Sequence, residues 1–135
     1  MFISETTIRV RYAETDQMGY VYYGNYAQYY EVSRVEALRQ IGTSYKQLED
    51  SGIMMPVVSM NINYKRPAFY DDILTVKTII KELPTTKMKF INEVYNDKNE
   101  LLNSAELLLV FVKKENMRPC KCPDWFLNLF SPYEF

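Results

Sequence analysis

The residues with the clearest potential for chemistry lie together between Arg11 and Tyr26, in a segment rich in tyrosine. Asp16 stands in a loop just upstream of a predicted helix, and the start of a helix offers free N–H groups and a partial positive charge. Such N–H groups can hold a developing oxyanion, and Gly24 would let a substrate approach the backbone closely. A carboxylate facing these groups is suited to acyl transfer, and this chemistry needs no histidine.

The absence of histidine narrows the possible chemistry more than any residue that is present. It excludes histidine-dependent nucleophile triads, histidine general bases and histidine metal ligands. The two cysteines, Cys120 and Cys122, have no histidine to complete a zinc site, which needs about four nitrogen or sulfur ligands. We therefore expect no metal, and any reaction must use carboxylates, tyrosines, lysines, hydroxyls or backbone dipoles.

One long helix follows this segment. Residues 25–41 predict it, because apolar and aromatic side chains recur there at spacings of three and four. Asn25 suits the N-cap position, and Gly42 suits the left-handed position after the helix. Val32 and Val35 widen the apolar stripe, so more than half of the helix should be buried.

Strands dominate the rest of the chain. A short second helix begins with a capping box at Ser44 and ends near Ser51, and the apolar pattern then changes to a period of two. A last helical turn is predicted at 124–130. The predicted strands cover residues 6–12, 56–66, 73–83, 87–95 and 102–113. This order is typical of an α+β fold in which the helix lies on one face of an antiparallel five-stranded sheet.

Length and composition exclude several classes of protein. The 135 residues suit one domain, residues 1–135, and the 47% of hydrophobic residues can fill a core. The formal net charge of −1 gives no sign of nucleic acid or an anionic membrane as a partner. No run approaches the roughly 18 apolar residues of a membrane span, and the first residues lack the pattern of a signal peptide. We therefore expect a cytoplasmic protein.

The segment from Arg11 to Tyr26 resembles the motif of the 4-hydroxybenzoyl-CoA thioesterase family, which has the hot-dog fold and includes the Tol–Pal-associated acyl-CoA thioesterases. The motif combines an aspartate two residues after a Glu- or Gly-type position, a Met-Gly or Ala-Gly pair, an apolar pair and an aromatic-rich Asn-Tyr that opens the helix. The resemblance covers roughly residues 6–115. Beyond the motif it is carried by Tyr29-Tyr30-Glu31, Arg34, Tyr64-Lys65-Arg66-Pro67-Ala68 and Asp72.

The resemblance implies a hot-dog fold and hydrolysis of a small acyl-CoA to the free acid and CoA. Asp16 matches the family's catalytic aspartate, which acts as nucleophile or as general base on water. The backbone N–H of Tyr23 matches the group that polarises the thioester carbonyl. Many members have histidine at this position, but a contact through the backbone survives the change to tyrosine. Coenzyme A is part of the substrate, so no separate cofactor is implied.

Several charged and aromatic residues have two interpretations. Lys65 and Arg66, like Lys113 and Lys114, could meet the phosphates of CoA, although charged strand ends more commonly lie in solvent. The tyrosines could line an acyl pocket, although such a stripe is more commonly core packing. These tyrosines are Tyr20, Tyr22, Tyr23, Tyr26, Tyr29 and Tyr30.

Other carboxylates are expected to have ordinary roles. Glu14 is expected to be a solvated loop charge, although its distance of two residues from Asp16 allows an acid–base pair. Glu31 and Arg34 are expected to form an i,i+3 ion pair on the helix, although some hot-dog thioesterases use a helix glutamate.

An alternative of another class is a non-catalytic module that binds acyl-CoA or acyl-carrier protein. The presence of Asp16 argues against it, because binding alone requires no carboxylate beside a thioester. A hot-dog dehydratase or hydratase is also disfavoured, because those enzymes rely on histidine.

The expected partners are the acyl-CoA substrate and further copies of the same chain. Residues 107–112 are apolar on both faces, and one helix cannot cover a curved sheet from both sides. Hot-dog relatives also build their sites between subunits. We therefore expect a homodimer or homotetramer.

Overall fold

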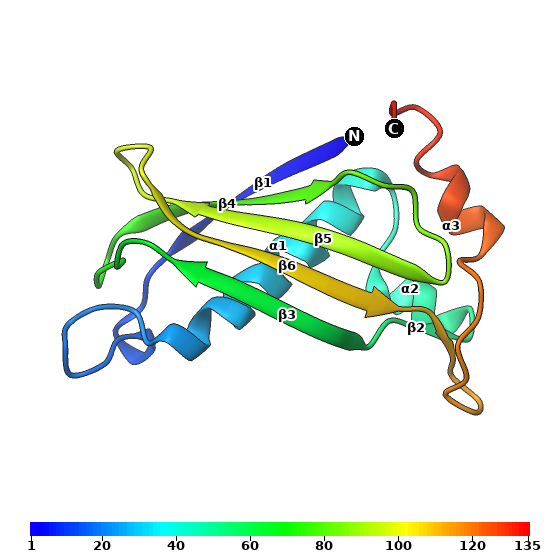
Figure 1. Cartoon of the computed structure of the whole chain (residues 1–135), viewed down its shortest axis with the longest axis horizontal. Coiled ribbons are helices and arrows are strands. Elements are labelled where there is room, and N and C mark those ends of the chain that lie inside the picture. Colours follow the sequence, from blue (N-terminus) through cyan, green and yellow to red (C-terminus); the bar gives the residue numbers. More distant parts are fainter.

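A five-stranded antiparallel sheet forms the centre of the computed structural model, which describes residues 1–135 (Figure 1). The strand order is β1-β4-β5-β6-β3, so β1 and β3 are the two edges. The strands are β1 (Phe2–Arg9), β3 (Val57–Tyr64), β4 (Ile73–Ile80), β5 (Lys87–Tyr95) and β6 (Leu101–Val110). The prediction of one long helix on a five-stranded antiparallel sheet is confirmed.

The long helix α1 (Tyr26–Ile41) packs against one face of the sheet, mainly over β1 and β4 (Figure 1). Its buried side chains are Tyr26, Tyr29, Tyr30, Ser33, Arg34, Ala37, Leu38 and Ile41. They share a core with the inward-facing residues of β4, β5 and β6. The predicted width of the stripe was wrong at Val32, which is 46% exposed because no second layer covers that side of the helix.

The two ends of α1 differ in how well they were predicted. Gly42 follows the helix with a left-handed φ of 112°, and its N–H donates to the carbonyls of Leu38 and Arg39, as expected. At the other end a 3₁₀ turn, η2 (Tyr23–Asn25), precedes the helix. Asn25 is therefore already helical and does not cap α1. Its side chain is used elsewhere, because Nδ2 donates to the carbonyl oxygen of Glu14 at 2.8 Å.

Smaller elements cover one end of the sheet. They are α2 (Tyr45–Asp50), β2 (Ile53–Met54), β7 (Val112–Lys113) and α3 (Asp124–Asn128). The pairing of β2 with β7 in a second small sheet was not predicted. Phe111 interrupts the predicted strand 102–113 and packs on Phe126 of α3, with ring centroids 5.6 Å apart. Part of the apolar surface of residues 107–112 is thus covered by the same chain.

Strand β1 differs most from its predicted range of 6–12. It begins at Phe2 because β4 offers a partner for every residue from Phe2, opposite Ile80, to Arg9, opposite Ile73. The chain then leaves the sheet, and Tyr12 begins the short 3₁₀ turn η1 (Tyr12–Glu14). None of the helices is long and apolar enough to cross a membrane.

Candidate active site

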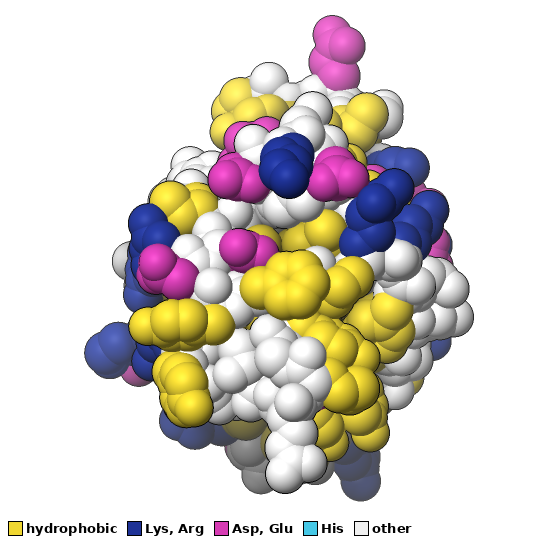
Figure 2. All heavy atoms as spheres, turned by 90° about the vertical axis from the view of Figure 1, so that its left-hand side faces the viewer, with side chains coloured by type: hydrophobic (Ala, Val, Ile, Leu, Met, Phe, Trp, Pro, Cys, Tyr) yellow, Lys and Arg dark blue, Asp and Glu magenta, His cyan; other side chains and the backbone are white.

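The predicted site lies at one end of the molecule, where the loop after β1, the start of α1 and the segment after β3 meet (Figure 1). Backbone pairing fastens these segments together. Tyr20 forms a β-bridge with Phe69, and the N–H of Val21 donates to the carbonyl of Ala68 at 2.8 Å. Figure 2 shows this end of the molecule, where hydrophobic side chains gather beside acidic and basic ones.

Asp16 lies in a narrow loop that is closed by a β-bridge between Thr15 and Val21. Its backbone N–H donates to the carbonyl of Tyr20 at 3.0 Å, and its Oδ1 accepts the N–H of Met18 at 2.8 Å. The side chain is partly buried, and Oδ2 has no hydrogen-bond partner within the chain. One carboxylate oxygen therefore holds the loop, while the other accepts no hydrogen bond from the chain.

The start of the helix carries two free N–H groups, those of Tyr23 and Gly24. Neither donates to an acceptor within the chain, whereas the N–H of Tyr22 donates to the Glu14 carbonyl and that of Asn25 to the Tyr22 carbonyl, both at 2.9 Å. A Cβ at position 24 would lie 2.9 Å from a ring carbon of Tyr22. Glycine at this position therefore lets the Tyr22 ring fold back against the helix start, beside the free N–H groups.

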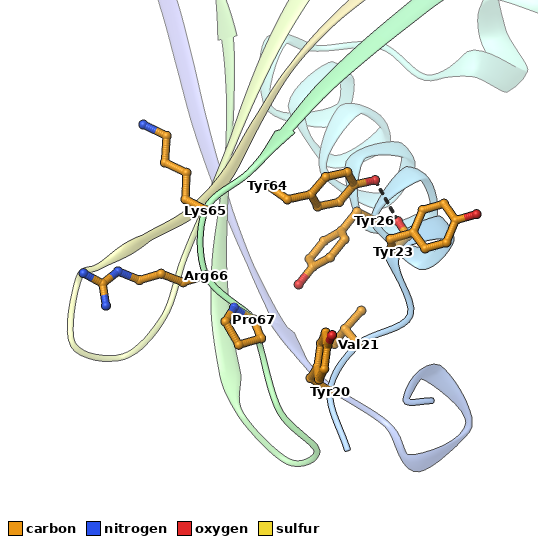
Figure 3. A pocket seen from close by; sticks show the side chains of 8 residues that line it. All are labelled: Tyr20, Val21, Tyr23, Tyr26, Tyr64, Lys65, Arg66 and Pro67. Carbon is orange, nitrogen blue, oxygen red and sulfur yellow. Dashed lines mark hydrogen bonds between the residues drawn. The ribbon is translucent and has the colours of Figure 1, made fainter. Parts of the chain in front are cut away.

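A hollow of about 390 Å³ opens between the helix start and the end of β3 (Figure 3). It is lined by Tyr20, Val21, Tyr23, Tyr26, Tyr64, Lys65, Arg66 and Pro67. The hydroxyl of Tyr64 donates to the Tyr23 carbonyl at 3.1 Å and so ties β3 to the helix start. Lys65 and Arg66 extend away from the aromatic rings, toward the rim (Figure 3).

The structure thus brings three of the four predicted site residues, Tyr23, Lys65 and Arg66, around one hollow and leaves Asp16 in the adjoining loop.

The charge of Asp16 also acts on the helix start. The pKa of the Tyr22 hydroxyl is raised, first by its hydrogen bond with Tyr23 and last by the negative charge of Asp16. The Asp16 carboxylate is therefore within electrostatic reach of the residue that precedes Tyr23.

Glu14 was expected to be a solvated charge, and this prediction was wrong. The residue is only 7% exposed. Its Oε1 accepts the N–H of Arg11 at 2.8 Å and the hydroxyl of Tyr29 at 2.9 Å, and the Arg11 guanidinium lies 3.1 Å from Oε2. Burial alone would raise the pKa of Glu14, but the hydrogen bonds from Arg11 and Tyr29 outweigh it and lower the pKa below its ordinary value.

The predicted ion pair between Glu31 and Arg34 is also wrong. Arg34 is buried, and its Nε lies 3.4 Å from the hydroxyl of Tyr45, whereas Glu31 lies in solvent. The two side chains lie on different faces of α1 because residue 34 belongs to the buried stripe.

The four basic residues do not form one group. Arg66 is 3.2 Å from Glu100 in an exposed ion pair, and Lys65 lies beside it at the rim of the hollow. Lys113 and Lys114 border a different hollow with Ser51, Gly52 and Ile53 at the other end of the sheet (Figure 1). Of these four residues, only Lys65 and Arg66 line the tyrosine-lined hollow.

The tyrosines divide between the two interpretations. Tyr20 and Tyr23 line the hollow, Tyr29 and Tyr30 belong to the core, and Tyr26 belongs to both. Tyr22 belongs to neither group. Burial raises the pKa of the Tyr26 hydroxyl to about 12. Tyr64 was not predicted to line the hollow, although the period of two places it on one face of the strand together with Met60 and Ile62.

The remaining candidate groups are metal-binding side chains and the two cysteines. No three His, Cys, Asp or Glu side chains come together where they could hold a metal ion. Both cysteines are free thiols, and burial raises the pKa of Cys122 to about 12.

Comparisons with known proteins assign the chain to a family. Residues 10–130 match the model of the thioesterase-like superfamily. A putative acyl-CoA thioesterase of Bacillus subtilis, YneP, is 38% identical over 129 residues, which are 93% of this chain and 94% of that protein. The acyl-CoA thioester hydrolase YbgC of Escherichia coli is 36% identical over 124 residues, 92% of each chain. A DHNA-CoA thioesterase structure from Staphylococcus aureus superposes with a TM-score of 0.90 at 36% identity, covering 98% of this chain and 91% of that one. The chain therefore belongs to the thioesterase-like superfamily, and it is a thioester hydrolase with the hot-dog fold.

Proposed function

We propose that this chain hydrolyses the thioester of a small acyl-CoA to the free acid and CoA. The observation that carries the proposal is the pair of free N–H groups on Tyr23 and Gly24, which lie beside an aromatic hollow and next to the loop of Asp16. The relatives YneP and YbgC, whose names give acyl-CoA thioester hydrolysis, support the same class of reaction.

The helix start supplies the oxyanion donor in this proposal. The backbone N–H of Tyr23 donates to the thioester oxygen as negative charge develops there. The partial positive charge at the start of the α1 helix adds to this stabilisation. Because the donor is a backbone group, the reaction does not depend on the side chain at position 23. The acyl group would occupy the hollow between Tyr26 and Tyr64.

Asp16 acts in one of two ways. As a general base it takes a proton from water while the water oxygen attacks the thioester carbon; the C–S bond then breaks and the proton passes to the CoA sulfur. As a nucleophile it forms a mixed anhydride with the acyl group and releases CoA, and water then hydrolyses the anhydride. The unpartnered Oδ2 suits both mechanisms, because the loop is held through Oδ1.

The CoA portion of the substrate would extend from the hollow past Lys65 and Arg66. Both side chains project from the rim on the side away from the aromatic rings (Figure 3). Lys65 has no acidic partner, whereas Arg66 would exchange its exposed pairing with Glu100 for a phosphate. An exposed ion pair contributes little to stability, so this exchange costs little.

The assembly proposed for the protein is a homodimer or a homotetramer. Strand β3 is an open edge, and along it Val58 and Met60 are 54% and 43% exposed because α1 lies over β1 and β4. An identical strand from a second copy can pair with this edge and present the same patch in return.

The test is release of free thiol from acyl-CoA, followed with a thiol-reactive dye over a panel of short, long, aliphatic and aromatic acyl groups. The proposal expects release well above the rate without protein for at least one small acyl-CoA. Binding of these acyl-CoAs in a calorimeter with no thiol release would refute it and would support a non-catalytic binding module.

A further inference from the structure

Glu14 makes two sets of bonds, one through its carboxylate and one through its backbone carbonyl. We propose that Glu14 is a positioning residue, which holds the loop of Asp16 at a fixed place against the free N–H groups of Tyr23 and Gly24. The inference rests on the proposed function. It assigns Glu14 no contact with the substrate.

The carboxylate end anchors the loop to the body of α1. Oε1 accepts the hydroxyl of Tyr29 at 2.9 Å, and Tyr29 is a buried residue in the first turns of the helix. The same carboxylate accepts the backbone N–H of Arg11 at 2.8 Å and pairs with its guanidinium at 3.1 Å. The bonds therefore join the end of the β1 segment to the helix.

The carbonyl end holds the helix start itself. The Glu14 oxygen accepts the N–H of Tyr22 at 2.9 Å and Nδ2 of Asn25 at 2.8 Å. These two donors stand on either side of Tyr23 and Gly24, whose N–H groups are left free. Glu14 thus fixes the turn that presents these groups, and Asp16 follows two residues later in the same chain segment.

An acid–base role for Glu14 is less consistent with these contacts. Both carboxylate oxygens already accept hydrogen bonds, and the residue is almost fully buried. The lowered pKa keeps the carboxylate charged, which is the form that accepts from Arg11 and Tyr29. Oδ2 of Asp16, in contrast, has no partner in the chain. The two carboxylates therefore have different roles, since Glu14 holds the loop in place and Asp16 reacts with the substrate or with water.

The first variants are Glu14→Gln and Tyr29→Phe. Glu14→Gln keeps the size of the side chain but cannot pair with the Arg11 guanidinium, and Tyr29→Phe removes only one hydroxyl donor. Because small misplacements of reacting groups cost rate rather than binding, kcat of Glu14→Gln should fall by about 10- to 100-fold with KM little changed. Tyr29→Phe should show a smaller fall of the same kind. Glu36→Gln is the matched control, because it breaks an Arg39–Glu36 pair at the same i,i+3 spacing on α1 and should leave both constants unchanged.

A double variant separates positioning from general structural support. If Glu14 acts through Asp16, adding Glu14→Gln to Asp16→Asn should lose less than the product of the two single losses. Unchanged kcat in both Glu14→Gln and Tyr29→Phe, or losses that multiply fully, would overturn the inference. A lower melting temperature with unchanged kcat would also overturn it, because that result means structural support alone. Full activity of Asp16→Asn by itself would refute the catalytic role of Asp16, and this inference with it.

Discussion

The hydroxyl of Tyr64 offers a sharp test of how the helix start is held. It donates at 3.1 Å to the carbonyl of Tyr23, which belongs to the same peptide group as the free N–H of Gly24. Tyr64→Phe removes this bond and keeps the ring that lines the hollow. A neutral hydrogen bond contributes about 0.5–1.5 kcal/mol net, and Tyr64 is 49% exposed, so water can replace part of the loss in the resting protein.

The expected effect on rate follows from this magnitude. If the whole bond energy serves the transition state, kcat falls by about 2- to 12-fold, since about 1.4 kcal/mol corresponds to a factor of ten. KM should stay nearly constant because the ring remains in place. The free energy of unfolding should fall by no more than about 0.5 kcal/mol, the low end expected for an exposed bond.

The assay is steady-state thiol release with Tyr95→Phe as the matched control. The Tyr95 hydroxyl also donates over 3.1 Å, to Glu93 within β5, and lines no part of the hollow. An unchanged kcat in Tyr64→Phe would refute the idea that this bond holds the helix start, where the Tyr23 N–H is the proposed oxyanion donor. A higher KM with unchanged kcat would mean that the hydroxyl contacts the substrate instead.

Three further predictions concern pH and assembly. With no histidine to titrate, kcat/KM should be flat between about pH 6 and 8, and a clear inflection near pH 6.5 would contradict this. The pKa of Glu14 lies below its ordinary value of 4.5 in the folded protein, because hydrogen bonds from Arg11 and Tyr29 outweigh its burial. The charged Glu14 side chain therefore stabilises the fold fully above pH 4.5, and this stabilisation is lost as the pH falls through the pKa of the folded protein. The gap in melting temperature between wild type and Glu14→Gln should accordingly narrow below that pH, and a constant gap would argue against the pairing. Sedimentation should give at least twice the 16.0 kDa of one chain, and Val58→Asp should shift the protein toward the monomer; a wild-type monomer at micromolar concentration would exclude the proposed assembly.

The elements that the sequence predicted well are those whose signal is local. The period of three and four in residues 26–41 and the left-handed position of Gly42 depend on neighbouring residues, and both are confirmed. The boundaries of the strands were predicted less well, because they depend on the partner strand. β1 extends back to Phe2 only because β4 continues to Ile80, a pairing that no pattern within residues 1–12 reveals.

The errors at the candidate site have the same origin. Glu14 and Arg34 were assigned to solvent and to a local ion pair, since charged residues are usually exposed. Glu14 also has a local partner in Arg11, but Tyr29 and Tyr45, which contact Glu14 and Arg34, lie 15 and 11 residues away and meet them only in the folded chain. The role of Tyr64 in the hollow was missed for a similar reason, because the end of β3 reaches the helix start only after the sheet has formed.

The proposed role of Asp16 as the reacting carboxylate is tested by the Asp16→Asn variant. Asparagine keeps Oδ1, which accepts the Met18 N–H, so the loop and the fold should persist, with stability within about 1 kcal/mol of wild type. Asp97→Asn, the same change at an exposed turn between β5 and β6, is the matched control. Thiol release from acyl-CoA should fall by at least ~100-fold in Asp16→Asn and stay unchanged in Asp97→Asn. Turnover near the wild-type rate in a folded Asp16→Asn protein would contradict this role.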